Sequence, residues 1–283
     1  MYAMLISAEE LLAHLHNPDW VVIDCRFSLQ EVDKGREDYL DGHIPGAIYA
    51  DLDTDLSGTV IPGKTSRHPF PPLDRVVALF SSWGIDEKVQ VVVHDFKGGG
   101  IAARLWWMLR WLGHEKVAIL DGGWGNWKDK NYPGSVLAPD REARQFIPRK
   151  QEGWTMDVDE VKKIKGDPEY RLVDSRNYER YIGQEEPIDP VAGHIPGAIN
   201  LPFMDNVDEN GFLRSPDILR PRFEKALGEV SADHTVFYCG SGVTSCHNIF
   251  VMDHLGLGMA RLYPGSWSEW IVDPNREVAT GVE

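Results

Sequence analysis

The strongest candidate for chemistry in this 283-residue sequence is one cysteine at the start of a glycine-bearing loop. Cys239 follows the apolar run Val236–Tyr238 and precedes Gly240-Ser241-Gly242-Val243-Thr244. The pattern predicts a buried strand, then a tight turn that glycine makes possible, then a helix near Ser245. Backbone N–H groups of such a loop and the positive helix end favour thiolate over thiol. We therefore expect Cys239 to be a nucleophile whose loop also holds an anionic sulfur or an oxyanion.

Other kinds of cysteine site fit less well. A cysteine phosphatase needs an arginine six residues after its cysteine to clamp phosphate, and here that position is Ser245. Three cysteines, Cys25, Cys239 and Cys246, are too few for a disulfide framework and lack the paired spacing of a zinc site. We expect a reduced, cytoplasmic protein that needs no metal or other cofactor.

The elements that position this loop occur twice in the chain. Four motifs of the first half return in the same order in the second, at offsets of 150, 151, 144 and 143 residues. The paired segments are Val21–Arg26 with Leu172–Arg176, Gly42–Ile48 with Gly193–Ile199, Val91–Asp95 with Thr235–Cys239, and Gly123–Trp127 with Ser266–Trp270. The sequence therefore predicts a tandem duplication.

Each copy alternates predicted helices and short β-branched strands, which indicates an α/β fold with a mainly parallel sheet and helices on both faces. The predicted helices lie at 8–16, 73–83, 158–165 and 218–227, and the predicted strands include 89–94, 117–120, 235–238 and 261–263. A polar stretch with two prolines separates the copies. We place the first domain at 1–138, the linker at 139–153 and the second domain at 154–283.

The duplication provides an internal comparison, because a feature present in both copies is more readily explained by the fold than by catalysis. Asp95 stands where the second copy has Cys239, so we expect the first copy to be inactive in sulfur chemistry. The repeated Asp-x-Arg pairs, the repeated His43 and His194 and the repeated tryptophans are expected to be structural. Arg180 is not repeated, since the matching residue is Gln30.

The duplicated unit, the Gly-His-Ile-Pro-Gly-Ala turn in each copy and the segment Cys239–Thr244 together resemble the tandem-domain rhodanese sulfurtransferases. The resemblance covers nearly the whole chain. It implies transfer of a sulfane sulfur through a persulfide on Cys239, with Gly240, Gly242, Val243 and Thr244 forming the substrate-binding loop. The loop is similar to that of the 3-mercaptopyruvate branch, and thiosulfate is the alternative donor.

The same resemblance implies roles for residues outside the loop. Arg180 would clamp the donor's carboxylate or sulfonate. Asp53, His68 and Ser241 would form a proton relay for the leaving pyruvate enolate. The mercaptopyruvate branch usually has a second arginine nine residues after the first, and here that residue is Asp189. Either another cation reaches the site, for which the candidates are Arg67, Lys97 and Arg104, or the donor differs.

Composition limits the partners. A formal net charge of −15 disfavours nucleic acids and anionic membranes. No apolar run is long enough to span a bilayer, and we expect no signal peptide. The expected partners are a small anionic sulfur donor and an acceptor, either cyanide or a thiol, which includes small thiols and thioredoxin-like proteins. A non-catalytic sulfur-carrier or interaction module is the other hypothesis.

Overall fold

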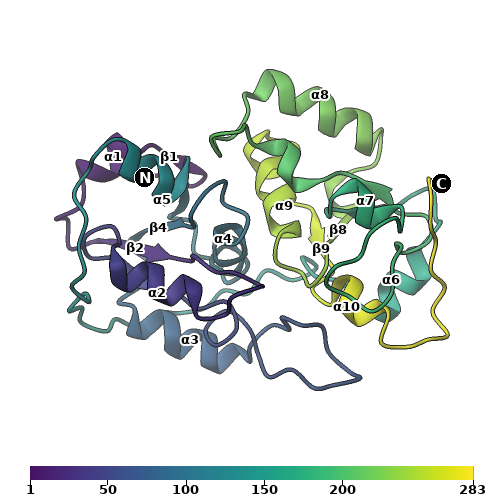
Figure 1. Cartoon of the computed structure of the whole chain (residues 1–283), viewed down its shortest axis with the longest axis horizontal. Coiled ribbons are helices and arrows are strands. Elements are labelled where there is room, and N and C mark those ends of the chain that lie inside the picture. Colours follow the sequence, from purple (N-terminus) through teal and green to yellow (C-terminus); the bar gives the residue numbers. More distant parts are fainter. Residues whose placement is uncertain (283) are drawn as a thin grey trace. The chain divides into compact units, whose positions relative to one another are not determined.

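The computed structural model describes residues 1–282, which form two compact units (Figure 1). The first unit contains 1–58, 70–151 and 207–213, and the second contains 59–69, 152–206 and 214 onward. Two short segments therefore belong to the unit built mainly from the other half of the sequence. These segments are equivalent in the two repeats. As a result, Arg67 and His68, although they come early in the sequence, are part of the second unit.

Within the first unit, the described residues form a sheet of five parallel strands in the order β1-β5-β4-β2-β3. The strands are β1 (Leu5–Ile6), β2 (Trp20–Asp24), β3 (Ile48–Tyr49), β4 (Gln90–His94) and β5 (Val117–Leu120). The helices are α1 (Ala8–Leu12), α2 (Lys34–Asp41), α3 (Leu73–Ser82), α4 (Ala102–Trp111) and α5 (Gly123–Asp129).

Within the second unit, the sheet has four parallel strands in the order β7-β6-β8-β9. The strands are β6 (Arg171–Asp174), β7 (Ile199–Asn200), β8 (Thr235–Tyr238) and β9 (Arg261–Leu262). The helices are α6 (Val158–Ile164), α7 (Tyr178–Tyr181), α8 (Pro216–Leu227), α9 (Ser245–His254) and α10 (Ser266–Trp270), with 3₁₀ turns at Phe203–Asn206 and Ala232–His234.

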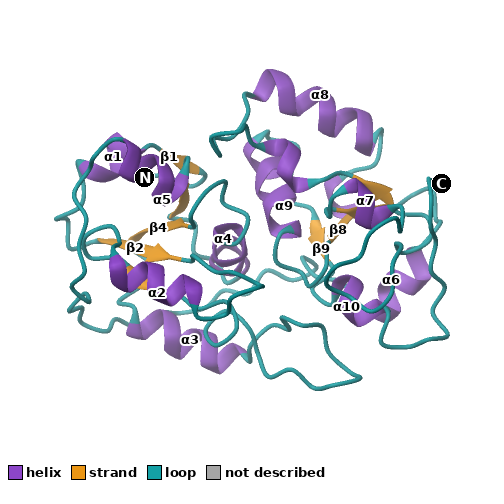
Figure 2. Ribbon diagram, viewed as in Figure 1, coloured by secondary structure: helices purple, strands orange, loops and turns teal. Residues whose placement is uncertain are grey.

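The predicted fold class is confirmed, since each unit is a parallel sheet flanked by helices (Figure 2). The central strands β4 and β8 are buried along their whole length, as expected for parallel strands covered on both faces. An isolated parallel bridge between Thr155 and Leu262 takes the place that β1 has in the first unit. The two sheets therefore share one topology, as the repeated motifs predict.

The repeated charged pairs are structural. The guanidinium of Arg26 holds the Asp24 carboxylate through Nε and Nη2 and donates from Nη2 to the carbonyl of Gly42 at 2.7 Å. Arg176 makes the same contacts with Asp174 and Gly193 in the second unit. Each pair is almost fully buried and fixes a strand end to the following turn.

The repeated histidines and tryptophans are also structural. His43 Nδ1 donates to the carbonyl of Tyr39 at 2.7 Å and stacks on that tyrosine. His194 does the same with Tyr181. Trp124 and Trp127 belong to the first hydrophobic core, and Trp267 and Trp270 belong to the second.

Most predicted elements lie where the patterns put them, and the differences have local causes. Ser7 caps α1 in a capping box with Glu10, but the helix ends at Leu12. The helix α2 was not predicted because its sequence is strongly polar and carries little apolar periodicity. Arg180 lies in the short helix α7, which the sequence analysis did not predict.

Candidate functional site around Cys239

Cys239 follows β8 directly and begins the loop that leads into α9. Its N–H donates to Ser266 Oγ at 3.1 Å, and its carbonyl accepts from the N–H of Trp267 at 3.0 Å. The Gly240 carbonyl accepts from the N–H of Ser268 at 2.9 Å. The start of α10 therefore holds the backbone on which the cysteine sits.

The thiol lies in a ring of hydrogen-bond donors. Burial alone would raise the pKa of Cys239, which is 2% exposed. Hydrogen bonding from the Thr244 hydroxyl and from the N–H groups of Ser241 and Ser245 outweighs this effect and brings the pKa below its ordinary value. These donors thus favour the thiolate, the reactive form of cysteine.

Two glycines let the loop close around the sulfur. Gly242 has φ of +78°, and a Cβ there would lie 2.3 Å from the carbonyl oxygen of Pro264. Gly240 lies beneath two guanidinium groups, since a Cβ there would be 2.8 Å from Arg67 Nη2 and 3.6 Å from Arg180 Nη2. Val243 is buried, and its carbonyl accepts from the N–H of Cys246 at the start of α9.

His68 and Ser241 of the predicted relay meet. His68 Nδ1 is hydrogen-bonded to Ser241 Oγ at 2.7 Å, and both side chains are buried. Asp53 lies in the first unit, where its N–H donates to the Asp51 carboxylate. Burial and the neighbouring Asp51 raise the pKa of Asp53. The structure thus brings a histidine to the loop serine, while the role of Asp53 stays a prediction.

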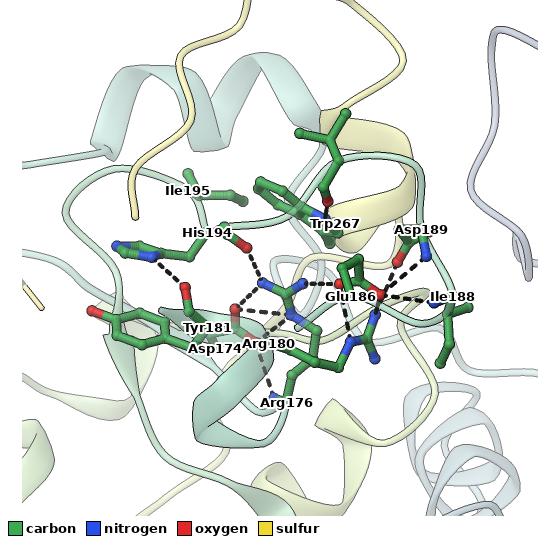
Figure 3. A network of polar contacts seen from close by, with 12 residues as sticks. Asp174, Arg176, Arg180, Tyr181, Glu186, Ile188, Asp189, His194, Ile195 and Trp267 are labelled. Carbon is green, nitrogen blue, oxygen red and sulfur yellow. Dashed lines mark hydrogen bonds and ion pairs between the residues drawn. The ribbon is translucent and has the colours of Figure 1, made fainter. Parts of the chain in front are cut away.

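A charged cluster lies next to the cysteine loop (Figure 3). Arg180 is 9% exposed and holds Glu186 through Nε and Nη2, at 3.0 and 2.7 Å. Arg180 Nη2 also donates to Asp189 Oδ2 at 3.0 Å, and Arg67 Nη1 pairs with Asp189 Oδ1. Burial, only partly offset by Arg67, raises the pKa of Asp189. Arg180 is therefore buried and fixed by two carboxylates, and it is not a solvated surface arginine.

Three cations were considered as replacements for the second arginine that the mercaptopyruvate branch usually has. One of them, Arg67, lies beside Gly240. Lys97 and Arg104 belong to the first unit. The Lys97 amine contacts the carbonyl of Glu209, and Arg104 is fully buried, with its guanidinium over the ring of Phe70.

The equivalent loop of the first unit has a carboxylate where the second has the thiol. We call the ring of N–H donors in this loop the anion cradle. The Asp95 carboxylate accepts four backbone N–H groups, from Lys97, Gly99, Ile101 and Ala102, at 2.9 to 3.2 Å. Its carbonyl accepts from Trp124 N–H, as that of Cys239 does from Trp267. The first loop is thus filled by its own carboxylate.

Ser266 contacts the Cys239 backbone, and the sequence analysis did not single it out for the site. Ser266 has φ of +54°, a left-handed conformation that is rare for serine, and its hydroxyl accepts from the N–H of Cys239. The matching Gly123 has φ of +58°. Gly123 aligns with Ser266 in the two copies. That glycine was the sequence signal that the position has a left-handed backbone conformation.

The other two cysteines have no sign of reactivity. Cys25 is fully buried, and burial together with Asp24 raises its pKa well above the ordinary value. Cys246 is also fully buried, and its thiol lies 3.5 Å from the carbonyl of Gly242. Within residues 1–282, no cluster of His, Cys, Asp or Glu could hold a metal ion, and no helix could cross a membrane.

Comparison with known proteins places this site in a family. A model described as the rhodanese-like domain matches residues 7–130 and 157–273. A probable 3-mercaptopyruvate sulfurtransferase of Pseudomonas aeruginosa is 42% identical over 280 residues, covering 99% of each chain. A putative thiosulfate sulfurtransferase of Mycobacterium tuberculosis is 36% identical, covering 98% of this chain and 97% of that one. The solved 3-mercaptopyruvate sulfurtransferase from Leishmania major superposes with a TM-score of 0.83 at 33% identity, covering 94% of this chain and 74% of that one.

Proposed function

Because the chain belongs to the rhodanese-like family, whose curated relatives are sulfurtransferases, we propose that it moves a sulfane sulfur from 3-mercaptopyruvate to an acceptor through a Cys239 persulfide. The observation that carries the proposal is the ring of donors around the sulfur. Those N–H and O–H groups stabilise the attacking thiolate. They equally stabilise the persulfide anion that replaces it.

In the first half-reaction, the Cys239 thiolate attacks the donor's thiol sulfur. A sulfur–sulfur bond forms, the donor's carbon–sulfur bond breaks, and its electron pair stays on carbon as the pyruvate enolate. The enolate takes up one proton and leaves as pyruvate. The persulfide loses the proton that the donor thiol carried, and Ser241 with His68 passes it to the enolate.

The proton path favours mercaptopyruvate over thiosulfate. With thiosulfate, the same thiolate attack releases sulfite, which leaves with its electron pair and needs no proton. A buried histidine held 2.7 Å from the loop serine therefore has a task only when the leaving group is a carbanion. We include Asp53 as the residue that orients His68, as the family resemblance implies.

In the second half-reaction, an acceptor thiolate or cyanide attacks the outer sulfur of the persulfide and restores the Cys239 thiolate. The acceptors are small thiols, a thioredoxin-like protein or cyanide, and the reaction takes place in the cytoplasm. The whole scheme is ping-pong and uses no metal.

We further propose a first domain at 1–138, a linker at 139–153 and a second domain at 154–283, with the reactive thiol in the second domain alone. Residues 59–69, which carry His68, join the compact unit of that second domain. A carboxylate in the place of the thiol can neither attack a donor sulfur nor carry a persulfide. Asp95 supports this assignment, because its oxygens already accept the backbone N–H groups of the first loop.

Intact-mass spectrometry after incubation with either donor tests the proposal. We expect the wild-type protein to gain one sulfur atom with 3-mercaptopyruvate, and faster than with thiosulfate. Cys239→Ser should gain none, whereas Cys246→Ser is the matched control and should gain one. If neither donor adds sulfur to the wild-type protein, the proposed function is wrong. If thiosulfate reacts faster, the donor assignment is wrong and the persulfide chemistry stands.

A further inference from the structure

The arginines of the second unit show how this protein holds carboxylates. Arg176 grips Asp174 with its Nε and Nη2 groups, and Arg180 grips Glu186 with the same pair. In the first unit Arg26 does so with Asp24. The Nε–Nη2 edge offers two parallel N–H donors that match the two oxygens of a carboxylate.

Arg67 presents that edge next to the cysteine loop without a carboxylate on it. Its Nη1 group is engaged by Asp189, while its Nε is buried and has no hydrogen-bond partner among the described residues. Its Nη2 lies 2.8 Å from where a Cβ of Gly240 would be. A buried charged donor without an acceptor is costly, which indicates a place for a ligand acceptor.

The backbone ties Arg67 to the reacting atoms. Its N–H donates to Ser268 Oγ at 3.2 Å, and the N–H of Ser268 donates to the carbonyl of Gly240. The next residue, His68, is hydrogen-bonded to Ser241. The segment that carries Arg67 is therefore fixed to the cysteine loop at two points. The side chain of Arg67 as a whole is 28% exposed, compared with 11% for Arg180.

The local charge requires Arg67. Arg180 shares its contacts with two carboxylates, Glu186 and Asp189, so without Arg67 this group would carry a net charge of −1. Such a site would repel an anionic donor. With Arg67 paired to Asp189, the four side chains balance, and the unoccupied edge of Arg67 makes the local field favourable to one further carboxylate.

We propose that Arg67 is a donor-binding residue that holds the carboxylate of the α-keto acid donor through its Nε–Nη2 edge, and that Asp189 is a positioning residue for it. This inference rests on the proposed function and specifies how that site selects its donor. Asp189 fixes the rotation of the guanidinium by occupying Nη1, which aims the opposite edge at the loop.

The test measures steady-state kinetics with 3-mercaptopyruvate for Arg67→Gln, Asp189→Asn and the control Lys64→Gln. Lys64 is an exposed cation on the same segment, outside the site. We expect Arg67→Gln to raise KM about 10-fold or more, with kcat changed much less, because a charge-assisted carboxylate contact is lost. Asp189→Asn keeps a hydrogen-bond acceptor for Arg67 but removes a negative charge, so it should lower KM. Lys64→Gln should match the wild type.

The opposite signs distinguish ligand binding from a structural role. If Arg67 and Asp189 only hold the loop together, both substitutions will raise KM and will also change the alkylation rate of Cys239 by iodoacetamide, a neutral reagent. That result, or a KM of Arg67→Gln within twofold of the wild type, overturns the inference. Persulfide formation by the wild-type protein is scored separately, so a failure here leaves the proposed function standing.

Discussion

Replacing Thr244 with valine removes one donor from the sulfur while keeping the shape of the side chain. The Thr244 hydroxyl is the largest of the contributions that lower the pKa of Cys239 against its burial. Thr244→Val should therefore raise that pKa, and the protein should need a higher pH to form the same fraction of thiolate. The sign follows because the lost hydroxyl stabilises the charged form only.

The size of the effect can be worked out from the contact. A hydrogen bond to a charged group contributes about 1.5–3 kcal/mol, which lowers the thiolate fraction about 10- to 150-fold at a fixed pH below the pKa. The thiolate that remains is more nucleophilic, with a Brønsted coefficient of about 0.4–0.5. The two effects oppose each other, so the net rate of attack should fall about 3- to 20-fold.

Alkylation of Cys239 by iodoacetamide, followed across pH by mass spectrometry, measures both quantities. Thr244→Ser is the matched control, because it retains the hydroxyl and should keep a profile close to the wild type. In Thr244→Val the midpoint should move to higher pH and the rate at neutral pH should drop. An unchanged midpoint with valine would show that the hydroxyl does not hold the thiolate, and the account of the donor ring would be refuted.

Three further changes probe the remaining parts of the site. His68→Asn should slow sulfur transfer from 3-mercaptopyruvate at least 10-fold in a single-turnover assay, and a comparable loss with thiosulfate would contradict the proton-path argument. Ser266→Gly should relieve the left-handed backbone but free the Cys239 N–H, lowering kcat without lowering the melting temperature; unchanged kcat would remove Ser266 from the site. Asp95→Ala leaves four N–H groups without their acceptor, two of them in buried contacts, and should cost about 1–3 kcal/mol of unfolding free energy in urea titrations while the persulfide still forms; unaltered stability would mean that the carboxylate does not satisfy these groups.

The fold was predictable because its signals are local and repeated. The strand 235–238 and the strand 117–120 were predicted to the residue, since short buried runs bounded by polar turns leave little freedom. The tight turn after Cys239 was also predictable, because its glycines indicated a backbone conformation that other residues rarely adopt. Gly242 has such a conformation, with a positive φ and no room for a Cβ. The helix α2 could not be predicted, because its sequence is strongly polar and carries little apolar periodicity.

The parts of the site that could not be predicted depend on contacts between distant segments. Arg67 is separated from Asp189 by 122 residues, and only the assignment of 59–69 to the second unit brings the two together. From the sequence, Asp189 looked like the loss of a cation. The sequence offered Arg67, Lys97 and Arg104 as replacement cations without a means to choose among them, and the structure places Arg67 beside Gly240 and Asp189.

The two repeats indicate that the loop of hydrogen-bond donors after the central strand belongs to the fold, since both copies have it. In both units the residue after the central strand has its carbonyl fixed by the N–H of a tryptophan, and in both an anion faces the backbone donors of the loop. A carboxylate in that position is an inert, permanent occupant. A thiol in the same position is forced toward its charged form, can change its covalent partner, and leaves the cradle intact after each transfer. The exchange at 95 and 239 is one difference between the two copies, and the unrepeated Arg180 is another.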